Sequence, residues 1–345
     1  MSNPELFLSC DWGTTSFRLR LVALSNCEIL HEFKEQSGVK TINDSLPSNL
    51  KEAKLTIARA SAFEKFFHSK ISNFLAAANL KTESLSIVIS GMASSSVGWK
   101  ELPYAHTPFP LTGARIQHGC LAFKLHEQNY PIHLLSGLQT ETDIMRGEET
   151  EILGLHSSGN FDNVFANGIV LLPGTHSKHV RIQDNVIKDF CTYMTGELYD
   201  VVAQHSLLKA SIDLSTTETP ADSPKLKEAF ITGALHARSH GLSRSLFKIR
   251  TRAILQDAPP TENRWFLSGL LIGTEVNDLV TQAPAIPILI SAPSTIASLY
   301  EMAVHALDAQ TEVLLAPSNL IQQASVLGQA TWLKRHLVEN PTRTN

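Results

Sequence analysis

Two stretches of the chain, far apart in the sequence, share one pattern: an apolar strand, a turn containing Gly-Thr-x-Ser, and a strand that returns from the turn. The three parts are residues 6–10, 11–16 and 17–24 in the first copy, and 169–172, 173–177 and 178–182 in the second. A further extended segment follows each copy, at 28–33 and at 186–190. A four-residue match is weak alone, but the shared setting of three strands favours duplication of one domain. The alternative is two unrelated hairpins.

The duplication predicts an α/β protein with two related domains. The chain has 345 residues, which at roughly 150 residues per domain also corresponds to two domains. Strand-like runs are 85–89, 131–135, 265–267 and 286–290, and helix-like runs are 61–78, 196–208, 226–246, 294–307 and 318–336. We expect an N-terminal domain over residues 1–140 and a C-terminal domain over 141–345, with the last helix able to pack back on the first domain.

Charge and hydropathy narrow the class of partner. Lys and Arg number 29 against 33 Asp and Glu, for a formal net charge of −4, without a dense basic run. We therefore expect no binding to nucleic acid or to anionic membranes, and a small molecule is the expected partner. No apolar stretch reaches the ~18 residues of a membrane span, and the residues before Leu6 lack the basic and apolar regions of a signal peptide. A cytoplasmic protein is expected.

The four cysteines are Cys10, Cys27, Cys120 and Cys191. They form no Cys-x-x-Cys pair and no metal-ligand spacing, so we interpret them as reduced and mostly buried small hydrophobic residues. Neither a disulfide scaffold nor a zinc module fits this sequence.

Both turns are suited to phosphate. A turn of Gly, Thr and Ser between buried strands exposes backbone N–H groups and hydroxyls that can donate to phosphate oxygens. The candidates are Gly13, Thr14, Thr15 and Ser16 in the first turn, and Gly174, Thr175, His176 and Ser177 in the second. Two such turns, one per domain, are expected to face each other across a nucleotide cleft. His176 is either an acid/base group or a hydrogen-bonding polar residue of the turn.

Asp11 ends the first strand of the first copy, where its carboxylate can reach a hydrated Mg²⁺ that bridges phosphates. Leu172 occupies the corresponding place in the second copy, so the metal is expected on the first half. The alternative for Asp11 is a turn-capping role. Lys178, just after the second turn, either contacts a phosphate or the substrate, or is a solvated strand residue.

The segment 143–155 carries the candidate general base. At about 100° per residue, Glu148 falls on one helical face with the apolar residues at 144, 145, 152 and 155. A carboxylate inside an apolar stripe is costly unless it is hydrogen-bonded or used, and desolvation would raise its pKa toward that of a general base. The alternative is a buried glutamate paired with Arg146 or with a backbone terminus.

Small residues gather at three predicted strand ends, where open α/β domains place ligands. These segments are 90–99, 268–273 and 291–294. In the first of them, Trp99 either stacks on a sugar or packs beneath the loop. None of the three segments is diagnostic alone.

These motifs make the sequence similar to a known family. A duplicated domain with D-x-G-T-T-S in a leading hairpin resembles the actin-like ATPase superfamily of sugar kinases, heat-shock ATPases and actin. Six blocks in order resemble the 2-dehydro-3-deoxygalactonokinase family. They are D-W-G-T-T-S-x-R-x-x-L at 11–21, G-M-A-S-S-x-x-G-W at 91–99, M-R-G-E-E-T at 145–150, L-P-G-T-H-S-K at 172–178, M-T-G-E-L at 194–198 and F-L-S-G-L-L-x-G at 266–273.

The resemblance implies duplicated actin-like (ribonuclease H-like) domains. It also implies a kinase that uses ATP and Mg²⁺ to phosphorylate 2-dehydro-3-deoxy-D-galactonate to its 6-phosphate in galactonate catabolism. The sugar acid and the first phosphate loop would belong to the N-terminal domain, and the second loop and the adenosine site to the C-terminal domain. The adenosine turn of the superfamily corresponds to Ser291, Ala292 and Ser294, although Ala292 and Pro293 replace frequent glycines, and Gly269 is the competing candidate.

For the wider sugar-kinase group, the resemblance places the catalytic acidic residue at Glu148, with Asp143 as second choice, and Mg²⁺ near Asp11. Arginine suits a substrate carboxylate because it binds in bidentate geometry. The expected substrate-binding residues are Arg18, Gly91, Ser94, Ser95, Trp99, Arg146 and Lys178.

Two other functions stay open. One is a kinase of the same fold for another sugar or sugar acid, and the other is a non-catalytic ATP- or sugar-binding protein with vestigial loops. Asp11, both turns and Glu148 are retained, and no helix-turn-helix start is present, which disfavours the second. The expected ligands are ATP and a sugar acid, and a homodimer is left open.

Overall fold

The computed structural model describes residues 5–49, 51–78, 85–125 and 128–340. The residues before Glu5, on which the signal-peptide prediction depends, lie outside this part. The chain forms two compact units. Unit 1 contains the described residues up to Asn160 together with those from Gln322 onward, and unit 2 runs from Phe161 to Ile321. The boundary between the units therefore lies after residue 160 instead of after residue 140.

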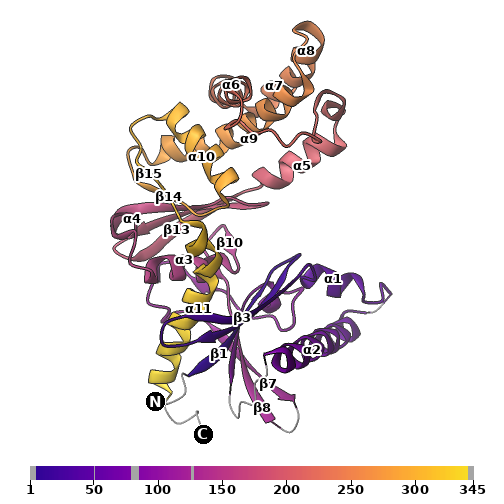
Figure 1. Cartoon of the computed structure of the whole chain (residues 1–345), viewed down its shortest axis with the longest axis vertical. Helices are drawn as coiled ribbons and strands as arrows, with labels where there is room; N and C mark the ends of the chain where they lie inside the picture. The colour runs from indigo at the N-terminus through magenta and orange to yellow at the C-terminus, as the bar shows by residue number, and fades with distance from the viewer. Residues whose placement is uncertain (1–4, 50, 79–84, 126–127, 341–345) are drawn as a thin grey trace. The chain divides into compact units, whose positions relative to one another are not determined.

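Unit 1 is built on a six-stranded sheet with the order β3-β2-β1-β4-β8-β7. Figure 1 labels four of its strands, β1, β3, β7 and β8. The strands of this sheet are β1 (Leu6–Trp12), β2 (Phe17–Ala23), β3 (Glu28–Glu35), β4 (Ser86–Gly91), β7 (His118–Leu125) and β8 (Gln128–Leu135). The first three form an antiparallel meander, β4 and β8 continue in parallel with β1, and β7 pairs antiparallel with β8. Shorter strands are β5 (Ala105–His106), β6 (Phe109–Pro110), β9 (Leu138–Gln139) and β10 (Ile144–Met145).

Unit 2 repeats this topology in a sheet of its own. Its strands are β11 (Gly168–Leu172), β12 (Ser177–Gln183), β13 (Val186–Tyr193), β14 (Ile288–Ile290) and β15 (Val313–Leu315). The order β13-β12-β11-β14-β15 matches β3-β2-β1-β4-β8, with an antiparallel meander followed by parallel strands. The repeated order confirms the predicted duplication and the actin-like α/β class, and the interpretation as two unrelated hairpins is wrong.

Helices cover both sheets. Unit 1 has α1 (Val39–Asp44), α2 (Glu52–Ala77), η1 (Met92–Ser94) and α3 (Glu148–Ser157), and it receives most of α11 (Ser318–Glu339). Unit 2 has α4 (Asp162–Asn167), α5 (Thr195–His205), η2 (Leu207–Ser211), α6 (Pro224–His240), α7 (Leu242–Leu246), α8 (Lys248–Leu255), α9 (Pro260–Gln282) and α10 (Ser294–Leu307).

Alternation along β1 decides which face of the sheet carries the site. Cys10 and Trp12 point into the apolar core beneath α2. Asp11 points to the opposite face, because successive strand residues alternate. Helix α11 covers that face: Nε2 of Gln329 donates to the Cys10 carbonyl oxygen at 2.9 Å and to the Ser90 hydroxyl at 2.8 Å.

The backbones of α3 and α11 are in close contact at two glycine residues, one on each helix. A Cβ atom on Gly154 would lie 1.8 Å from the Ala324 carbonyl oxygen, and one on Gly328 would lie 1.9 Å from the Thr150 carbonyl oxygen. Only residues without a Cβ atom allow backbones this close. This contact explains why residues 141–160 and the last helix both belong to unit 1.

Residues 265–267, predicted as a strand, lie in helix α9. The short run is apolar because α9 is buried against α6, where a Cβ atom on Gly269 would lie 2.0 Å from the Phe230 carbonyl oxygen. The segment 268–273 therefore continues a helix and does not follow a strand, and its glycines serve helix packing.

Two predicted helices also change. The run 226–246 is divided into α6 and α7 at Gly241, where φ is +74°. The helix predicted over 143–155 begins only at Glu148, because residues 144–145 form β10 and Gly147 has a φ of +110°.

The four cysteines are free, as predicted, but they are not mostly buried. Cys10 is buried and Cys27 is half-buried, whereas Cys120 and Cys191 are exposed. Cys120 lies on β7 and Cys191 on β13.

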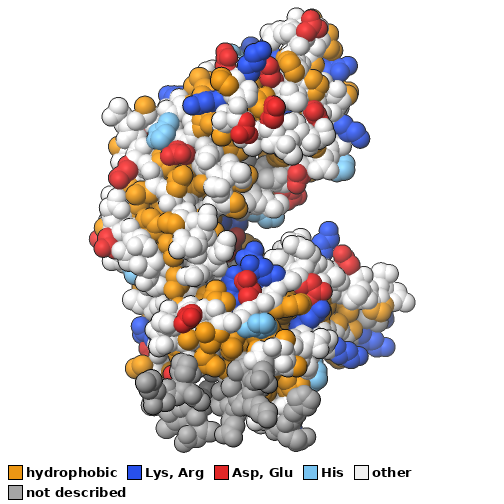
Figure 2. All heavy atoms as spheres, viewed as in Figure 1, with side chains coloured by type: hydrophobic (Ala, Val, Ile, Leu, Met, Phe, Trp, Pro, Cys, Tyr) orange, Lys and Arg blue, Asp and Glu red, His pale blue; other side chains and the backbone are white. Residues whose placement is uncertain are grey.

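The surface agrees with the charge balance. On the face shown in Figure 2, basic and acidic side chains of the described residues are interspersed and form no single basic surface. No helix within residues 5–340, leaving out the gaps given above, combines the length and the apolar character needed to cross a bilayer.

Candidate active site

The turn between β1 and β2 is held by the N-terminus of α1. The carbonyl groups of Gly13, Thr14 and Thr15 accept hydrogen bonds from the N–H groups of residues 38–40. The N–H of Gly13 donates to the Ser16 carbonyl at 2.9 Å. Among the described residues, the N–H groups of Thr14 and Thr15 have no acceptor. The turn therefore presents donors of the kind that bind phosphate.

The turn between β11 and β12 has the same form. The N–H of Gly174 lies 3.4 Å from the Ser177 hydroxyl, and the N–H groups of Thr175 and His176 have no acceptor in the part of the chain that the structure describes. Helix α5 begins beside this turn, since a Cβ atom on Gly196 would lie 2.5 Å from the Gly174 carbonyl oxygen. A helix N-terminus next to these donors favours an anion.

His176 is engaged by α5. Its Nε2 lies 2.6 Å from Oε2 of Glu197, and the Glu197 N–H donates to the Thr175 carbonyl at 3.1 Å. This pairing favours the hydrogen-bonding role over the acid/base role. The M-T-G-E-L block at 194–198 thus supports the second turn, a role that the sequence alone did not suggest.

A buried carboxylate braces the second turn from behind. Glu275 of α9 is 1% exposed, and it accepts hydrogen bonds from His179 Nε2 at 2.6 Å, from the Tyr300 hydroxyl at 2.8 Å and from the Thr195 hydroxyl. The Tyr300 hydroxyl also lies 2.9 Å from the Ser177 hydroxyl. Burial, followed by the neighbouring Glu275 carboxylate, keeps the pKa of Tyr300 well above its ordinary value. The network joins β12, α5, α9 and α10, so no local sequence pattern predicted it.

A pocket of ≈ 320 Å³ opens beside the second turn, within unit 2. Its walls come from that turn and from α5, α9 and α10. Its lining residues include Gly174, Tyr199, Trp265, Ser268 and Ile296. The volume and the mixture of aromatic, apolar and polar groups are typical of a small-molecule site.

The predicted adenosine residues do not form this wall. Gly269 lies in the contact between α9 and α6, and its neighbour Ser268 lines the pocket instead. The segment 291–294 joins β14 to α10, and the pocket is reached only further along the helix, from Ile296 onward.

Unit 1 gathers carboxylates at the carboxyl end of β1. The Asp11 side chain is 21% exposed, and its Oδ2 lies 3.6 Å from Nη1 of Arg18, the residue opposite it on β2. Desolvation raises the pKa of Asp11 above its ordinary value; Arg18 and Arg20 oppose the shift, and the charge of Glu148 adds to it.

Glu149, and not Glu148, is the buried glutamate of α3. Its carboxylate accepts from the Gly147 N–H at 2.8 Å and from the Thr150 hydroxyl at 2.9 Å. Burial, followed by the charge of Glu148, raises the pKa of Glu149 to about 7. Glu148 itself is half-buried and accepts from the Arg146 N–H at 2.9 Å. The predicted stripe was wrong because it counted the strand residues 144–145 as helical.

Glu151 is a site residue that the sequence reasoning missed. Burial, followed by the charges of Asp11, Glu148 and Glu149, raises its pKa to about 8. Glu151 lies one turn of helix beyond Glu148, so an i, i+3 pattern of acidic residues was its only signal. Together, Asp11, Glu148, Glu149 and Glu151 form what we call the carboxylate cluster.

Asp143 precedes β10 and is not part of α3. It lies in the turn between β9 and β10, where its Oδ1 accepts from the Ile144 N–H at 2.7 Å. The charges that shift the pKa values of Asp11 and Glu151 come from the other acidic residues and from arginines.

Arg146 holds two loops together. Its Nη1 donates to the Ser94 hydroxyl at 2.7 Å, its Nη2 donates to the Leu102 carbonyl at 3.3 Å, and its guanidinium lies 4.1 Å from the Tyr104 ring centroid. The Ser94 hydroxyl in turn donates to the Leu135 carbonyl at 2.6 Å. Arg146 and Ser94 are thus already engaged, whereas Arg18 stands at the carboxylate cluster with a side chain 41% exposed.

The remaining predicted substrate residues differ in their surroundings. Gly91 has a φ of +92°, and its Cα atom would lie 3.3 Å from a Cβ atom on Gly147, so it adjoins the start of α3. The Ser95 hydroxyl donates to the Met92 carbonyl at 2.8 Å. The Trp99 ring lies 5.1 Å from the Phe67 ring and belongs to the core of unit 1, which favours the packing role.

Lys178 is not a solvated strand residue. It is 4% exposed, and its ammonium group donates to the His176 carbonyl at 3.2 Å. Its charge is therefore held next to the second turn, in agreement with a role toward an anion.

The carboxylate cluster and the two turns combine complementary chemistry. Carboxylate oxygens are ligands that Mg²⁺ prefers, and a divalent cation would offset the mutual repulsion that adds to desolvation in raising the pKa values of Asp11, Glu149 and Glu151. Asp11 and Glu148, whose charges act on each other, are groups of the type that can hold Mg²⁺. A carboxylate whose pKa lies near neutrality also suits proton transfer. The turns supply donors for phosphate.

Comparison with known proteins agrees with these features. A family model described as 2-keto-3-deoxy-galactonokinase matches residues 11–325. A protein of Rhizobium meliloti (strain 1021), named "Probable 2-dehydro-3-deoxygalactonokinase DgoK1", is 30% identical over 282 residues, which cover 80% of this chain and 81% of the relative. The 2-dehydro-3-deoxygalactonokinase of Escherichia coli (strain K12) is 27% identical over 308 residues, covering 87% and 90%.

A solved structure shares the fold. It is a crystal structure of a candidate 2-dehydro-3-deoxygalactonokinase from Sinorhizobium meliloti, with a TM-score of 0.76 and 26% identity, and the match covers 95% of this chain and 99% of that one. The duplicated α/β units, the two phosphate-type turns and the family match over almost the whole chain lead to one conclusion: the chain belongs to the 2-keto-3-deoxy-galactonokinase family.

Proposed function

We propose that the protein is an ATP-dependent kinase that phosphorylates 2-dehydro-3-deoxy-D-galactonate on its terminal hydroxyl, in galactonate catabolism. The hydroxyl oxygen forms a bond to the γ-phosphorus, the bond from that phosphorus to the ADP oxygen breaks, and the hydroxyl proton passes to a carboxylate. The observation that carries the proposal is the carboxylate cluster next to the first turn, in which the N–H groups of Thr14 and Thr15 have no acceptor among the described residues. The family membership supports the choice of substrate.

Each part of the nucleotide has a proposed contact. The N–H groups of Thr14 and Thr15 in unit 1, and of Thr175 and His176 in unit 2, bind phosphate oxygens. The adenosine occupies the pocket between α5, α9 and α10, where Trp265 and Tyr199 offer aromatic surfaces. Mg²⁺, held by Asp11 and an α3 carboxylate, would neutralise phosphate charge when bound.

The general base is proposed to be Glu148, with Glu151 as the competing residue. Glu148 opens α3, and its charge acts on Asp11, whereas burial raises the pKa of Glu151 to about 8. Carboxylates this close share protons, so their titration belongs to the cluster. Arg18 is proposed to bind the substrate carboxylate, because its Nη1 lies 3.6 Å from Asp11 Oδ2 at the carboxylate cluster and its side chain is 41% exposed.

Two isosteric variants distinguish the candidate bases. We expect Glu148→Gln to lower kcat by a factor of about 10² to 10⁴, the usual contribution of general acid–base catalysis, with little change in the Kd for ATP. Glu151→Gln then keeps a kcat within about one order of magnitude of the unaltered protein. The reverse outcome would transfer the role to Glu151. Full activity of both variants would refute a carboxylate base on α3.

A coupled assay for ADP release tests the function itself. The purified protein is given ATP, Mg²⁺ and a panel of acceptors that includes 2-dehydro-3-deoxy-D-galactonate, its C4 epimer and aldohexoses. The highest kcat/KM is expected for the galactonate derivative. A higher value for another acceptor would identify a kinase of the same fold with a different substrate, and ATP binding without turnover of any acceptor would identify a non-catalytic binding protein.

We also propose that the protein works in the cytoplasm, where ATP is available. A homodimer is a separate hypothesis, and sedimentation equilibrium of the full chain tests it.

A further inference from the structure

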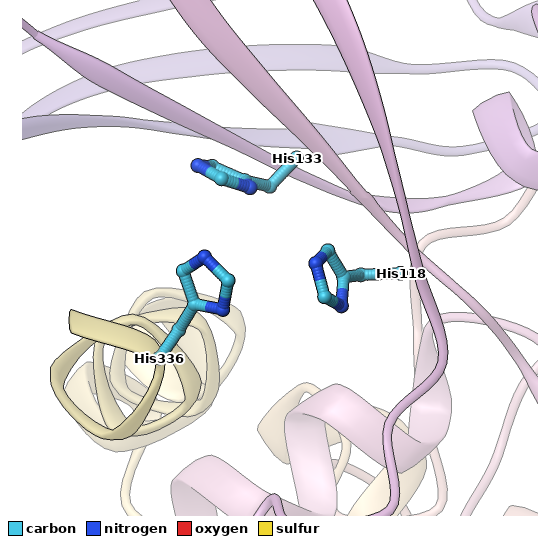
Figure 3. Close-up of side chains that lie close together, drawn as sticks. All are labelled: His118, His133 and His336. Carbon is cyan, nitrogen blue, oxygen red and sulfur yellow. The ribbon is translucent and has the colours of Figure 1, made fainter. Parts of the chain in front are cut away.

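Three histidines converge away from the carboxylate cluster. They are His118 on β7, His133 on β8 and His336 on α11, and each offers a ring nitrogen within 4.8 Å of the others. Figure 3 shows the three rings turned toward one common space from two strands and one helix. The ring centroids are 4.9 Å apart for His118 and His336, and 5.0 Å apart for His133 and His336.

The fold dictates this meeting. In the β7–β8 pair, His133 stands opposite Cys120, and His118 lies two residues before Cys120. The alternation of strand side chains therefore puts His118, Cys120 and His133 on one face of the sheet. The neighbours Ile132 and Leu134 point to the other face, into the core beneath α2. The histidine face is the one that α11 covers.

Neighbouring groups orient the rings. The Trp332 ring, one turn earlier on α11, stacks on His336 with centroids 4.8 Å apart and an interplanar angle of 13°. The Asn340 side-chain amide lies 3.4 Å from Nδ1 of His336, and the Cys120 sulfur lies 3.8 Å from Nδ1 of His133. Partners of this kind resemble the second-shell groups that orient metal-binding histidines.

We propose that His118, His133 and His336 form a site for a divalent transition-metal ion, Zn²⁺, with water as the fourth ligand. Imidazole suits Zn²⁺, whereas the all-oxygen carboxylate cluster suits Mg²⁺, so the two sites take different ions. Tetrahedral Zn–N bonds of about 2.0–2.1 Å need nitrogens roughly 3.4 Å apart. The nitrogens lie within 4.8 Å of one another, so they must approach by up to about 1.4 Å, which rotation of the imidazole rings about their side-chain torsions can supply.

The site would fasten α11 to the sheet of unit 1. The same helix carries Gln329, whose side chain bonds the Cys10 carbonyl directly before Asp11. Metal binding would thus stabilise the helix that supports the carboxyl end of β1. The role is structural and requires no change in the proposed chemistry.

A competition titration tests the site. The untagged full chain is freed of metal with EDTA and titrated with Zn²⁺ against a chromophoric chelator. The proposal predicts one tight equivalent, a raised midpoint of thermal unfolding, and an affinity lowered more than about tenfold in His118→Gln and in His336→Gln. The control His305→Gln, an exposed histidine on α10, should bind like the unaltered protein.

Cobalt gives a second measurement. Co²⁺ in place of Zn²⁺ should show the visible absorption of a tetrahedral site, and His118→Gln should lose it. If the unaltered protein binds no stoichiometric Zn²⁺, or if it and His118→Gln bind Zn²⁺ equally well, the proposal is overturned. In that case the histidines and Trp332 are an aromatic packing cluster.

Discussion

Replacing Glu275 by Ala removes the carboxylate behind the second turn. In the structure this group is 1% exposed and accepts hydrogen bonds from His179, Thr195 and Tyr300. After the substitution these buried donors lose their acceptor together. Because the Tyr300 hydroxyl also meets the Ser177 hydroxyl at 2.9 Å, the second turn should loosen as well.

The magnitude follows from burial. One unsatisfied buried donor costs about 1–3 kcal/mol of folding free energy. The substitution also removes the cost of burying the charged carboxylate, which offsets part of the total for the three donors. Loss of one partner from a buried charged network typically destabilises by about 3–5 kcal/mol. At about 2–4 °C per kcal/mol for 150–250 residues, the unfolding midpoint should fall by roughly 6–20 °C. The unfolding midpoint of Glu275→Gln should lie between those of Glu275→Ala and the unaltered protein, because the amide keeps the side-chain volume and one acceptor oxygen.

Thermal and denaturant unfolding measure the change, and ATP titration reports on the turn. The matched control is Glu262→Ala on the same helix, whose carboxylate is 23% exposed and 3.9 Å from Arg252. A pair of this kind contributes less than about 1 kcal/mol. We expect Glu275→Ala, but not Glu262→Ala, to raise the Kd for ATP severalfold. If both variants unfold within about 1 kcal/mol of the unaltered protein, the bracing role is refuted.

Three further predictions concern packing, pH and the pocket. Gly269→Ala should destabilise by about 1–3 kcal/mol in denaturant unfolding, because its methyl group would overlap the Phe230 carbonyl; an unchanged midpoint would contradict the α6–α9 contact. Glu149 and Glu151, with pKa values raised to about 7 and about 8, hold protons in the folded state that the unfolded chain releases near pH 4.5. The stability that these two protonated groups contribute is therefore greatest below pH 4.5 and is lost as pH rises through 7 and 8. The free energy of unfolding should fall by a few kcal/mol between pH 5 and 8.5, and it should fall less steeply in Glu151→Gln. Equal pH dependence of the two proteins would contradict the raised pKa of Glu151. Ser268→Leu should fill the pocket and raise the KM for ATP without changing that for the sugar acid; an unaltered KM for ATP would place adenosine elsewhere.

The repeated meander was the most predictable part of the fold. Its strands carry their own pattern of apolar residues, and the Gly-Thr-x-Ser turns mark where they reverse. Helix α9 was less predictable, because residues 265–267 are apolar on all sides: a helix buried against α6 lacks the polar face that distinguishes a helix from a buried strand.

The candidate site residues likewise divide into those that the sequence predicts and those that only the fold brings together. Asp11 and the turn residues were identifiable because they follow short strands directly. The identity of the buried glutamate depended on the first residue of α3, which Gly147 fixes through its positive φ. Glu275 and the pocket residues come from segments far apart in the sequence. Only the packing of α5, α9 and α10 brings them together.

The most direct test of the proposed function is the identity of the product. Phosphorus NMR of the purified protein with ATP, Mg²⁺ and 2-dehydro-3-deoxy-D-galactonate should show one new phosphomonoester on the terminal carbon, formed in equal amount with ADP. The Glu148→Gln variant should form it far more slowly. ADP release without a phosphorylated sugar acid, or phosphate on any other oxygen, would contradict the account.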